Sequence, residues 1–158
     1  MHLKILIDNW DDIVNKILKS QTILFHELKV GMSESFKKKI TQEDIENFAK
    51  VSSDFNPVHF DKEFAKKTIF KEPIAHGMLS ASFISAVIGE RLPGNGTIYL
   101  SQTLKFHRPV FINQEVETTV KIQSIMKEKK QVSLDCNCKV NKKIVISGLA
   151  LVLAPSTY

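Results

Sequence analysis

The sequence predicts an α+β domain in which an antiparallel sheet wraps around one long apolar helix. Residues 77–89 carry no charge and are apolar nearly all round, a pattern typical of a helix buried in a protein core. Residues 98–106, 116–122 and 132–140 alternate apolar and polar side chains, which indicates strands with one buried face. Residues 144–153 are apolar on both faces and predict a central strand.

The start of the chain predicts a helix outside this domain. Residues 3–18 place apolar side chains at helical spacing with charge on the other side. The apolar positions are Leu6, Trp10, Ile13, Val14 and Ile17. We therefore expect an N-terminal amphipathic helical extension over residues 1–20 and a single domain over residues 21–158, since a chain of 158 residues suits one core.

Between the extension and the buried helix, the sequence predicts shorter elements. Residues 22–28 are interpreted as a short strand and residues 33–40 as an exposed strand. Thr41 starts a helix, because Asp44 follows it three residues later in the manner of a capping box. The helix is expected to end before Ser52.

Composition excludes several classes of protein. Hydrophobic residues make up 43% of the chain and charged residues 25%, which is typical of a globular domain rather than a disordered or disulfide-stapled chain. The net charge of +5 is mostly lysine and is interpreted as a solvated surface, with attraction to a phosphorylated carrier as the alternative. The sequence has no arginine-rich cluster and no zinc spacing, so we expect no nucleic-acid partner. The longest uncharged run, residues 73–89, is marginal in length for a membrane span, and no membrane partner is expected.

The two cysteines indicate a reducing compartment. Cys136 and Cys138 are two residues apart, so a strand places both on one face, where they are poorly placed to bridge each other. They are interpreted as small buried thiols. Asp8, Asp11 and Asp12 interrupt the start of the chain and argue against a secretory signal, so we expect a cytoplasmic protein.

Residues 54–59, which read Asp-Phe-Asn-Pro-Val-His, bring together the groups of a hydration site. Asp54 supplies a carboxylate and His59 an imidazole, while the proline between them makes the segment irregular, so the two side chains can converge. Gly77 opens the buried helix, whose N-terminus offers backbone N–H groups. These are the parts needed to add water to a polarised double bond. An Asx-turn for Asp54 and a half-buried, backbone-bonded His59 are the alternatives.

These residues resemble the (R)-specific enoyl-CoA hydratases, also called MaoC-like dehydratases. The resemblance runs from about Leu28 to the C-terminus and rests on residues 53–61, 73–79, 93–96, 104–106 and 108–110. Ser53 departs from the family pattern, in which glycine is expected before the aspartate, and the N-terminal extension lies outside it. The resemblance implies the hot-dog fold, a homodimer, a lyase (hydro-lyase) activity and a place in fatty acid metabolism.

The resemblance also implies residue roles. Asp54 would activate water, and His59 would orient that water or exchange its proton. The N–H of Gly77 would hold the thioester carbonyl as an oxyanion donor. Asn56 would hold the water or pin the loop. Ser85 would hydrogen-bond near the catalytic pair, with a bond to its own helix backbone as the alternative.

Several neighbouring residues are interpreted more simply. His76 is predicted to be a packing or loop hydrogen-bonding group rather than an acid or base. Lys105, His107 and Arg108 are interpreted as a solvated strand end, with contact to carrier phosphates as the alternative. No metal or redox cofactor is expected, because the thioester itself supplies the acidity of C2 and coenzyme A or acyl carrier protein is only its handle.

The sequence therefore predicts reversible hydration of trans-2-enoyl thioesters to (R)-3-hydroxyacyl thioesters. The alternatives on the same fold are an acyl-thioester hydrolase, a 3-hydroxyacyl-acyl carrier protein dehydratase and a non-catalytic acyl-thioester-binding module. Release of free thiol would identify a hydrolase, and tight binding without turnover would identify a binding module. Acyl chain length, the carrier and the pathway remain open.

Overall fold

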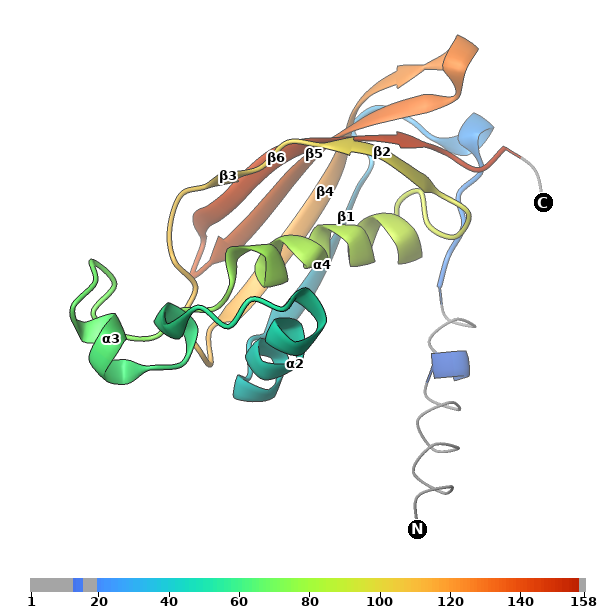
Figure 1. The fold of residues 1–158 in the computed structure, drawn as a ribbon. Helices are drawn as coiled ribbons and strands as arrows, with labels where there is room; N and C mark the ends of the chain where they lie inside the picture. The colour runs from blue at the N-terminus through green and yellow to red at the C-terminus, as the bar shows by residue number, and fades with distance from the viewer. Residues whose placement is uncertain (1–12, 16–19, 157–158) are drawn as a thin grey trace.

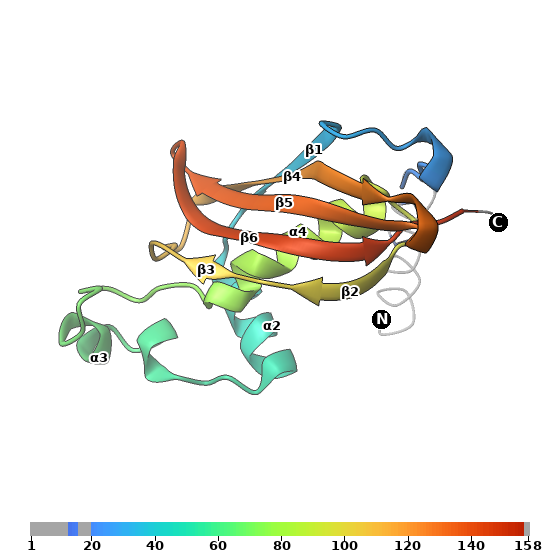
Figure 2. The ribbon, with the colours of Figure 1, turned by 90° about the horizontal axis from the view of Figure 1, so that it is seen from above.

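One antiparallel six-stranded sheet curves over a long helix in the computed structural model, which describes residues 13–15 and 20–156 (Figures 1 and 2). The main strand order is β1-β4-β5-β6-β2, and β3 pairs with β6. The strands are β1 (Ser33–Lys39), β2 (Ile98–Gln102), β3 (Lys105–Phe106), β4 (Glu115–Met126), β5 (Gln131–Val140) and β6 (Lys143–Leu153). The predicted α+β architecture is confirmed. Most of the predicted extension over residues 1–20 lies outside the described residues, of which residues 13–15 are helical.

The central helix α4 (Gly77–Glu90) is the predicted apolar helix and lies in the concave side of the sheet. It packs against β4, β5 and β1. Its side chains enter the core on more than one side, because Leu79, Phe83, Ile84, Val87 and Ile88 are all buried. Burial of this much apolar surface stabilises the domain and fixes the position of the helix start, where Gly77 lies.

The inner face of the sheet follows the predicted alternation. On β5 every second residue is buried, and both Cys136 and Cys138 belong to this inner set. Both thiols are free, and burial raises the pKa of Cys136 to about 12. The cysteines therefore act as small apolar side chains of the core, as the sequence predicts.

The helix α2 (Gln42–Ser52) delivers the chain to the loop that begins at Ser53. Its capping box is formed, since the Asp44 N–H donates to Thr41 Oγ1 at 3.1 Å and the Thr41 N–H donates to Asp44 Oδ2 at 2.9 Å. Ser53 ends the helix in the left-handed region at φ 62°. A residue without a bulky side chain suits this conformation, which explains how serine stands where glycine was expected.

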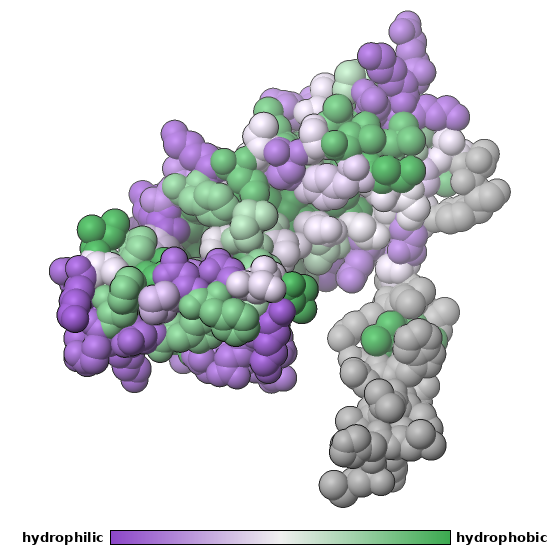
Figure 3. All heavy atoms as spheres, viewed as in Figure 1, coloured by the Kyte–Doolittle hydropathy of each residue, from purple (hydrophilic) through white to green (hydrophobic). Residues whose placement is uncertain are grey.

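Two short elements follow this loop. The 3-10 turn η2 (Pro57–His59) carries His59, and α3 (Lys62–Lys66) starts at Asp61, whose Oδ1 accepts two backbone N–H bonds. Figure 3 shows hydrophilic residues gathered over α3 and over the hairpin that joins β4 to β5, with more apolar residues between them. On this face, hydrophilic residues are therefore more frequent at the two ends of the domain than between them.

The strand predicted over residues 98–106 is divided into β2 and β3. The break falls at Thr103, whose carbonyl approaches Gly148 so closely that a Cβ there would lie 1.8 Å from the oxygen. The Thr103 N–H donates to the Leu149 carbonyl at 2.9 Å. This close approach, called the strand crossing below, interrupts the regular pairing with β6. A second irregularity lies within β2, whose register against β6 shifts between Tyr99 and Ser101.

The apolar side chains of β2 are not buried, contrary to the predicted alternation. Ile98 is 56% exposed and Leu100 is 45% exposed. β2 is the terminal strand of the sheet path, so its outer edge has no neighbouring strand within the described chain. Burial of this strand would need a surface beyond the residues that the structure describes.

The predicted strand over residues 22–28 is wrong. The segment forms a 3-10 turn, η1 (Phe25–Glu27), and a single bridge between Thr22 and Gly94. Its chain bonds across to the end of α4, where the Ile23 N–H donates to the Pro93 carbonyl, and long-range contacts outweigh the local strand preference. None of the helices in the described part of the chain is long and apolar enough to cross a membrane.

Candidate active site

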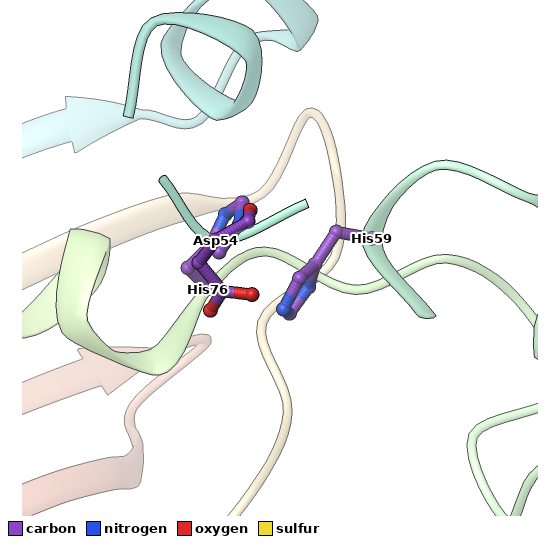
Figure 4. A group of neighbouring side chains, drawn as sticks. All are labelled: Asp54, His59 and His76. Carbon is purple, nitrogen blue, oxygen red and sulfur yellow. The ribbon is translucent and has the colours of Figure 1, made fainter. Parts of the chain in front are cut away.

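A hollow of about 260 Å³ lies between the loop after α2, the start of α4 and strand β3. Six residues line it: Asp54, His59, His76, Gly77, Met78 and Phe106. Figure 4 shows the three ionisable side chains of this group gathered together, with an oxygen of Asp54 directed toward the His59 ring. The structure therefore brings the predicted acid and imidazole into one place, with the predicted oxyanion donor beside them.

The loop that carries Asp54 is held by its own side chains. The Asn56 N–H donates to Asp54 Oδ1 at 3.2 Å, and the Val58 N–H donates to Asn56 Oδ1 at 3.1 Å. Pro57 starts the 3-10 turn, whose last residue is His59, and the His59 N–H donates to the Asn56 carbonyl at 3.1 Å. Asp54 thus forms the Asx-turn that was its structural alternative, while its second oxygen remains available to the hollow.

His59 is buried at 8% exposure and has a defined tautomer. Its Nδ1 lies 2.8 Å from the carbonyl of Ile74, which can only accept, so Nδ1 carries the proton. In the neutral ring, Nε2 is then left as an acceptor. Burial lowers the pKa of His59 and the nearby His76 lowers it further, against the opposing effects of the Ile74 carbonyl and Asp54.

His76 lies directly against this histidine. The two ring centroids are 3.7 Å apart with planes inclined by 30°. His76 is 2% exposed, and its Nε2 donates to the backbone carbonyl of Asp54 at 3.0 Å. The prediction that His76 packs and hydrogen-bonds to the loop is confirmed.

The separation of these groups suits one shared water. One polar atom each from Asp54, His59 and His76 lies within 4.8 Å of the others. A water that bonds two partners at about 2.8 Å spans roughly 4.5 Å between them. The same atoms are near enough to be considered as metal ligands, although one nitrogen of each imidazole is engaged by a backbone carbonyl. The separation therefore suits a shared water, and the expectation of no metal stays a prediction.

Gly77 is the first residue of α4 and lies under the ring of Phe106. No acceptor in the described part of the chain bonds its N–H, which belongs to the first turn of the helix. A Cβ at Gly77 would lie 2.8 Å from Phe106 Cε1. Glycine is favoured here because a larger side chain would have to displace the neighbouring ring, and not because of its φ, which is not positive.

Two predicted site residues do not line the hollow. Asn56 is exposed, and its side chain pins the loop as described. Ser85 is exposed on α4, eight residues beyond Gly77 or about 12 Å along the helix axis. A direct role in chemistry for either residue stays a prediction.

A second hollow of about 260 Å³ adjoins the first through Gly77 and Phe106. His107 and Arg108 lie at its wall, but both bond to β6, His107 with Ser147 Oγ at 2.8 Å and Arg108 to a backbone carbonyl at 2.6 Å. These bonds favour their interpretation as residues of a strand end.

Sequence reasoning missed the place of Phe106 in the site. Its alternation within residues 98–106 indicated a core side chain, whereas it is half-exposed over Gly77. The signal available in the sequence was Gly77 itself, because a glycine at a helix start leaves room for a neighbouring group to approach closely.

A curved antiparallel sheet on a buried helix, with an acid and an imidazole at the helix start, is the arrangement of a hot-dog protein with a hydratase-like site. Residues 27–143 match the MaoC like domain. The chain belongs to this MaoC-like family.

Relatives and solved structures agree with this assignment. The chain is 48% identical over 132 residues to an (R)-specific enoyl-CoA hydratase of Rhodospirillum rubrum, covering 84% of this chain and 92% of the relative. It is 42% identical over 135 residues to a 3-hydroxybutyryl-CoA dehydratase of Methylorubrum extorquens, covering 85% and 86%. The structure of R-hydratase PhaJ1 from Pseudomonas aeruginosa superposes with a TM-score of 0.82 at 41% identity, covering 87% of this chain and 89% of that one.

Proposed function

We propose that this protein is an (R)-specific enoyl-CoA hydratase, a hydro-lyase that reversibly hydrates trans-2-enoyl-CoA to (R)-3-hydroxyacyl-CoA. The observation that carries the proposal is the convergence of Asp54 and His59 within 4.8 Å beside the Gly77 N–H. The R configuration and the coenzyme A handle come from the relatives, whose names state them. In the metabolism of fatty acids, such an activity interconverts enoyl and hydroxyacyl thioesters.

The reaction is written with Asp54 as the base. A water between the two side chains donates one O–H to the Asp54 carboxylate and the other to His59 Nε2. As the water oxygen bonds to C3, its proton passes to Asp54, and the electrons of the double bond move toward the thioester oxygen. Asp54 then returns the proton to C2, so that water is added across the double bond and the carboxylate is regenerated.

Gly77 stabilises the charge that develops during this step. Its N–H lies at the positive end of α4, where an enolate oxygen gains from both the hydrogen bond and the helix dipole. The same contact polarises the ground-state carbonyl. His59 orients the water as a neutral ring, because its proton is engaged by Ile74.

We propose that the reaction needs no metal or redox cofactor. The chemistry requires only proton transfer and charge stabilisation at the carbonyl, and both functions are available from Asp54 and Gly77. Activity that survives dialysis against a chelator supports this part of the proposal, whereas activity that is lost and then restored by added metal contradicts it.

We propose that the protein is a homodimer joined along β2. Ile98, Tyr99 and Leu100 are exposed on this terminal strand, and an unpaired strand edge with apolar side chains is a ready interface for a second copy. Light scattering should give twice the chain mass for the wild type and the chain mass for Leu100→Lys. A monomeric wild type at micromolar concentration contradicts the proposed dimer.

Crotonyl-CoA tests the proposed activity directly. Loss of enoyl absorbance without release of free thiol supports a hydratase, while thiol release identifies an acyl-thioester hydrolase. Parallel assays with an acyl carrier protein thioester decide whether that carrier is also accepted. Absence of turnover on short, long and carrier-linked enoyl chains rejects the enzyme and favours a binding module.

The two unionised thiols of the core fit a cytoplasmic location.

A further inference from the structure

His76 contacts both predicted catalytic residues, at the backbone carbonyl of Asp54 and the ring of His59, although it has no catalytic role of its own so far. It is the residue that caps α4 and immediately precedes Gly77, yet its side chain makes no capping bond. Instead, the ring is turned toward the loop, where it is almost completely buried. The contacts of this buried imidazole with Asp54 and His59 indicate its role.

The first contact fixes Asp54. The bond from His76 Nε2 to the Asp54 carbonyl is 3.0 Å long and joins residues 22 positions apart. Asp54 is otherwise exposed, and its remaining bonds are with Ser52 at the end of α2 and with Asn56 in the loop. This hydrogen bond is therefore the tie between the Asp54 backbone and the start of α4.

The second contact fixes His59. Its ring stacks on that of His76, which is backed by Phe48 from α2 at 5.1 Å and approached by Phe60 at 6.0 Å between ring centroids. An imidazole enclosed on these sides has little freedom to rotate. The His59 plane is set by this stack and by its bond to Ile74.

We propose that His76 is a positioning residue of the hydration site, which fixes the separation of Asp54 and His59 through one hydrogen bond and one stacked ring. This inference rests on the proposed hydratase function. Gly77 follows His76 directly in the chain. His76 therefore also sets where the Asp54 and His59 side chains lie relative to the Gly77 N–H, which holds the carbonyl. Misplacement by about 1 Å costs on the order of a hundredfold in rate, so such a device matters to catalysis.

The charges around the stack support this role. His76 Nδ1 is buried with no partner among the described residues, which suits a bare lone pair better than an N–H. The His76 ring lowers the pKa of His59, after the larger effect of burial, so its removal raises that pKa. The other ionisable groups that face or border His59 are Asp54, Lys62, Lys66, Lys71 and Glu72.

Two substitutions separate the two contacts. His76→Gln retains an amide donor for the Asp54 carbonyl but lacks the ring, and His76→Phe retains a ring but lacks the donor. We expect each to lower kcat on crotonyl-CoA by about 10- to 100-fold while KM changes less than about threefold. We also expect the acidic limb of the kcat/KM profile to move to higher pH. His26→Gln, at an exposed histidine of η1, is the matched control and should retain wild-type kinetics.

The outcomes that overturn the proposal are distinct from failure of the hydratase assignment. A folded His76→Gln or His76→Phe variant with wild-type kcat overturns it, since both contacts are required. If neither variant folds, imidazole nitrogen NMR of the wild type at pH 8 decides: a proton on Nε2 of His76 supports the proposal, and a proton on Nδ1 overturns it. The NMR test holds even if the wild type fails to hydrate crotonyl-CoA, a result that would count against the proposed function alone.

Discussion

The two walls of the hollow are built in different ways. Residues 53–60 are mostly exposed and are held by short bonds between neighbouring residues, such as that from Val58 to Asn56. The opposite wall is the start of α4, where His76 is buried and the helix behind it is embedded in the core. The loop supplies the reactive side chains, and the helix supplies the fixed frame. Substitutions of the loop side chains should therefore remove a reacting group and lower kcat strongly. Substitutions at the start of α4 should displace the groups of the site and have smaller effects.

The largest expected effect is that of Asp54→Asn. Removal of the base should lower kcat by about 10³-fold, the middle of the range for general acid–base catalysis, with little change in thermal stability. Glu43→Gln, an exposed carboxylate-to-amide change on α2, is the matched control. Steady-state hydration of crotonyl-CoA measures both. Near wild-type turnover in the Asp54 variant would end the assignment of chemistry to the loop.

A smaller loss, of about 10²-fold, is expected for His59→Gln. In the wild type, burial lowers the pKa of His59, so the acidic limb of the kcat/KM profile should lie below pH 6.5 and should change shape in the variant.

The same lowered pKa makes the stability of the wild type depend on pH. As the pH falls, His59 is protonated in the unfolded chain before it is protonated in the folded protein. The free energy of unfolding should therefore decrease as pH falls from 6.5 to the pKa of the folded state, which urea titrations at several pH values can measure. A free energy of unfolding that increases as the pH falls through this range contradicts the lowered pKa of His59.

The frame is tested by Gly77→Ala. The substitution keeps the N–H but places a Cβ 2.8 Å from Phe106 Cε1, so the ring must move. We expect kcat/KM to fall by about tenfold, because the carbonyl site is displaced rather than removed. Addition of Phe106→Leu should recover most of the loss. No recovery in the double variant would show that the ring does not determine this position.

Asn56→Ala tests how the loop is held. Loss of the bond to the Val58 N–H should cost about 1 kcal/mol, or about 3 °C in Tm for a domain of this size. Calorimetry measures this change, and kcat should fall less than in either catalytic variant. A loss of kcat as large as that of Asp54→Asn would indicate that the amide acts on the water directly.

The smallest effect is expected for Ser85→Ala. Ser85 is exposed and lies along α4 from the hollow, so loss of one hydrogen bond to substrate would cost about 1 kcal/mol, or about fivefold in kcat/KM. Comparison of short and long enoyl chains locates the contact. Unchanged kinetics with every chain length would remove Ser85 from the site.

Much of the architecture could be predicted from local patterns. The capping box of Thr41 and Asp44, the uncharged helix and the alternation on β5 are local signals, and each is formed. The division of the strand over residues 98–106 could not be predicted, because it depends on the approach of Thr103 to Gly148 across the sheet. Residues 54–59 and Gly77 were identifiable by residue type and order. The stacking of His59 on His76 was not, since it depends on how η2 and the start of α4 bring residues 17 positions apart face to face.

Gly148 lies on β6, outside the lining of the hollow, yet it admits the backbone crossing from which β3 continues to Phe106. The position of the Phe106 ring over Gly77 therefore depends on the close approach of Thr103 to Gly148, although neither of these two residues reacts. Any larger side chain at that crossing would have to displace the Thr103 carbonyl before the fold could close. A side chain at Gly148 would therefore disturb both the edge of the sheet and the path of the chain from Thr103 to Phe106.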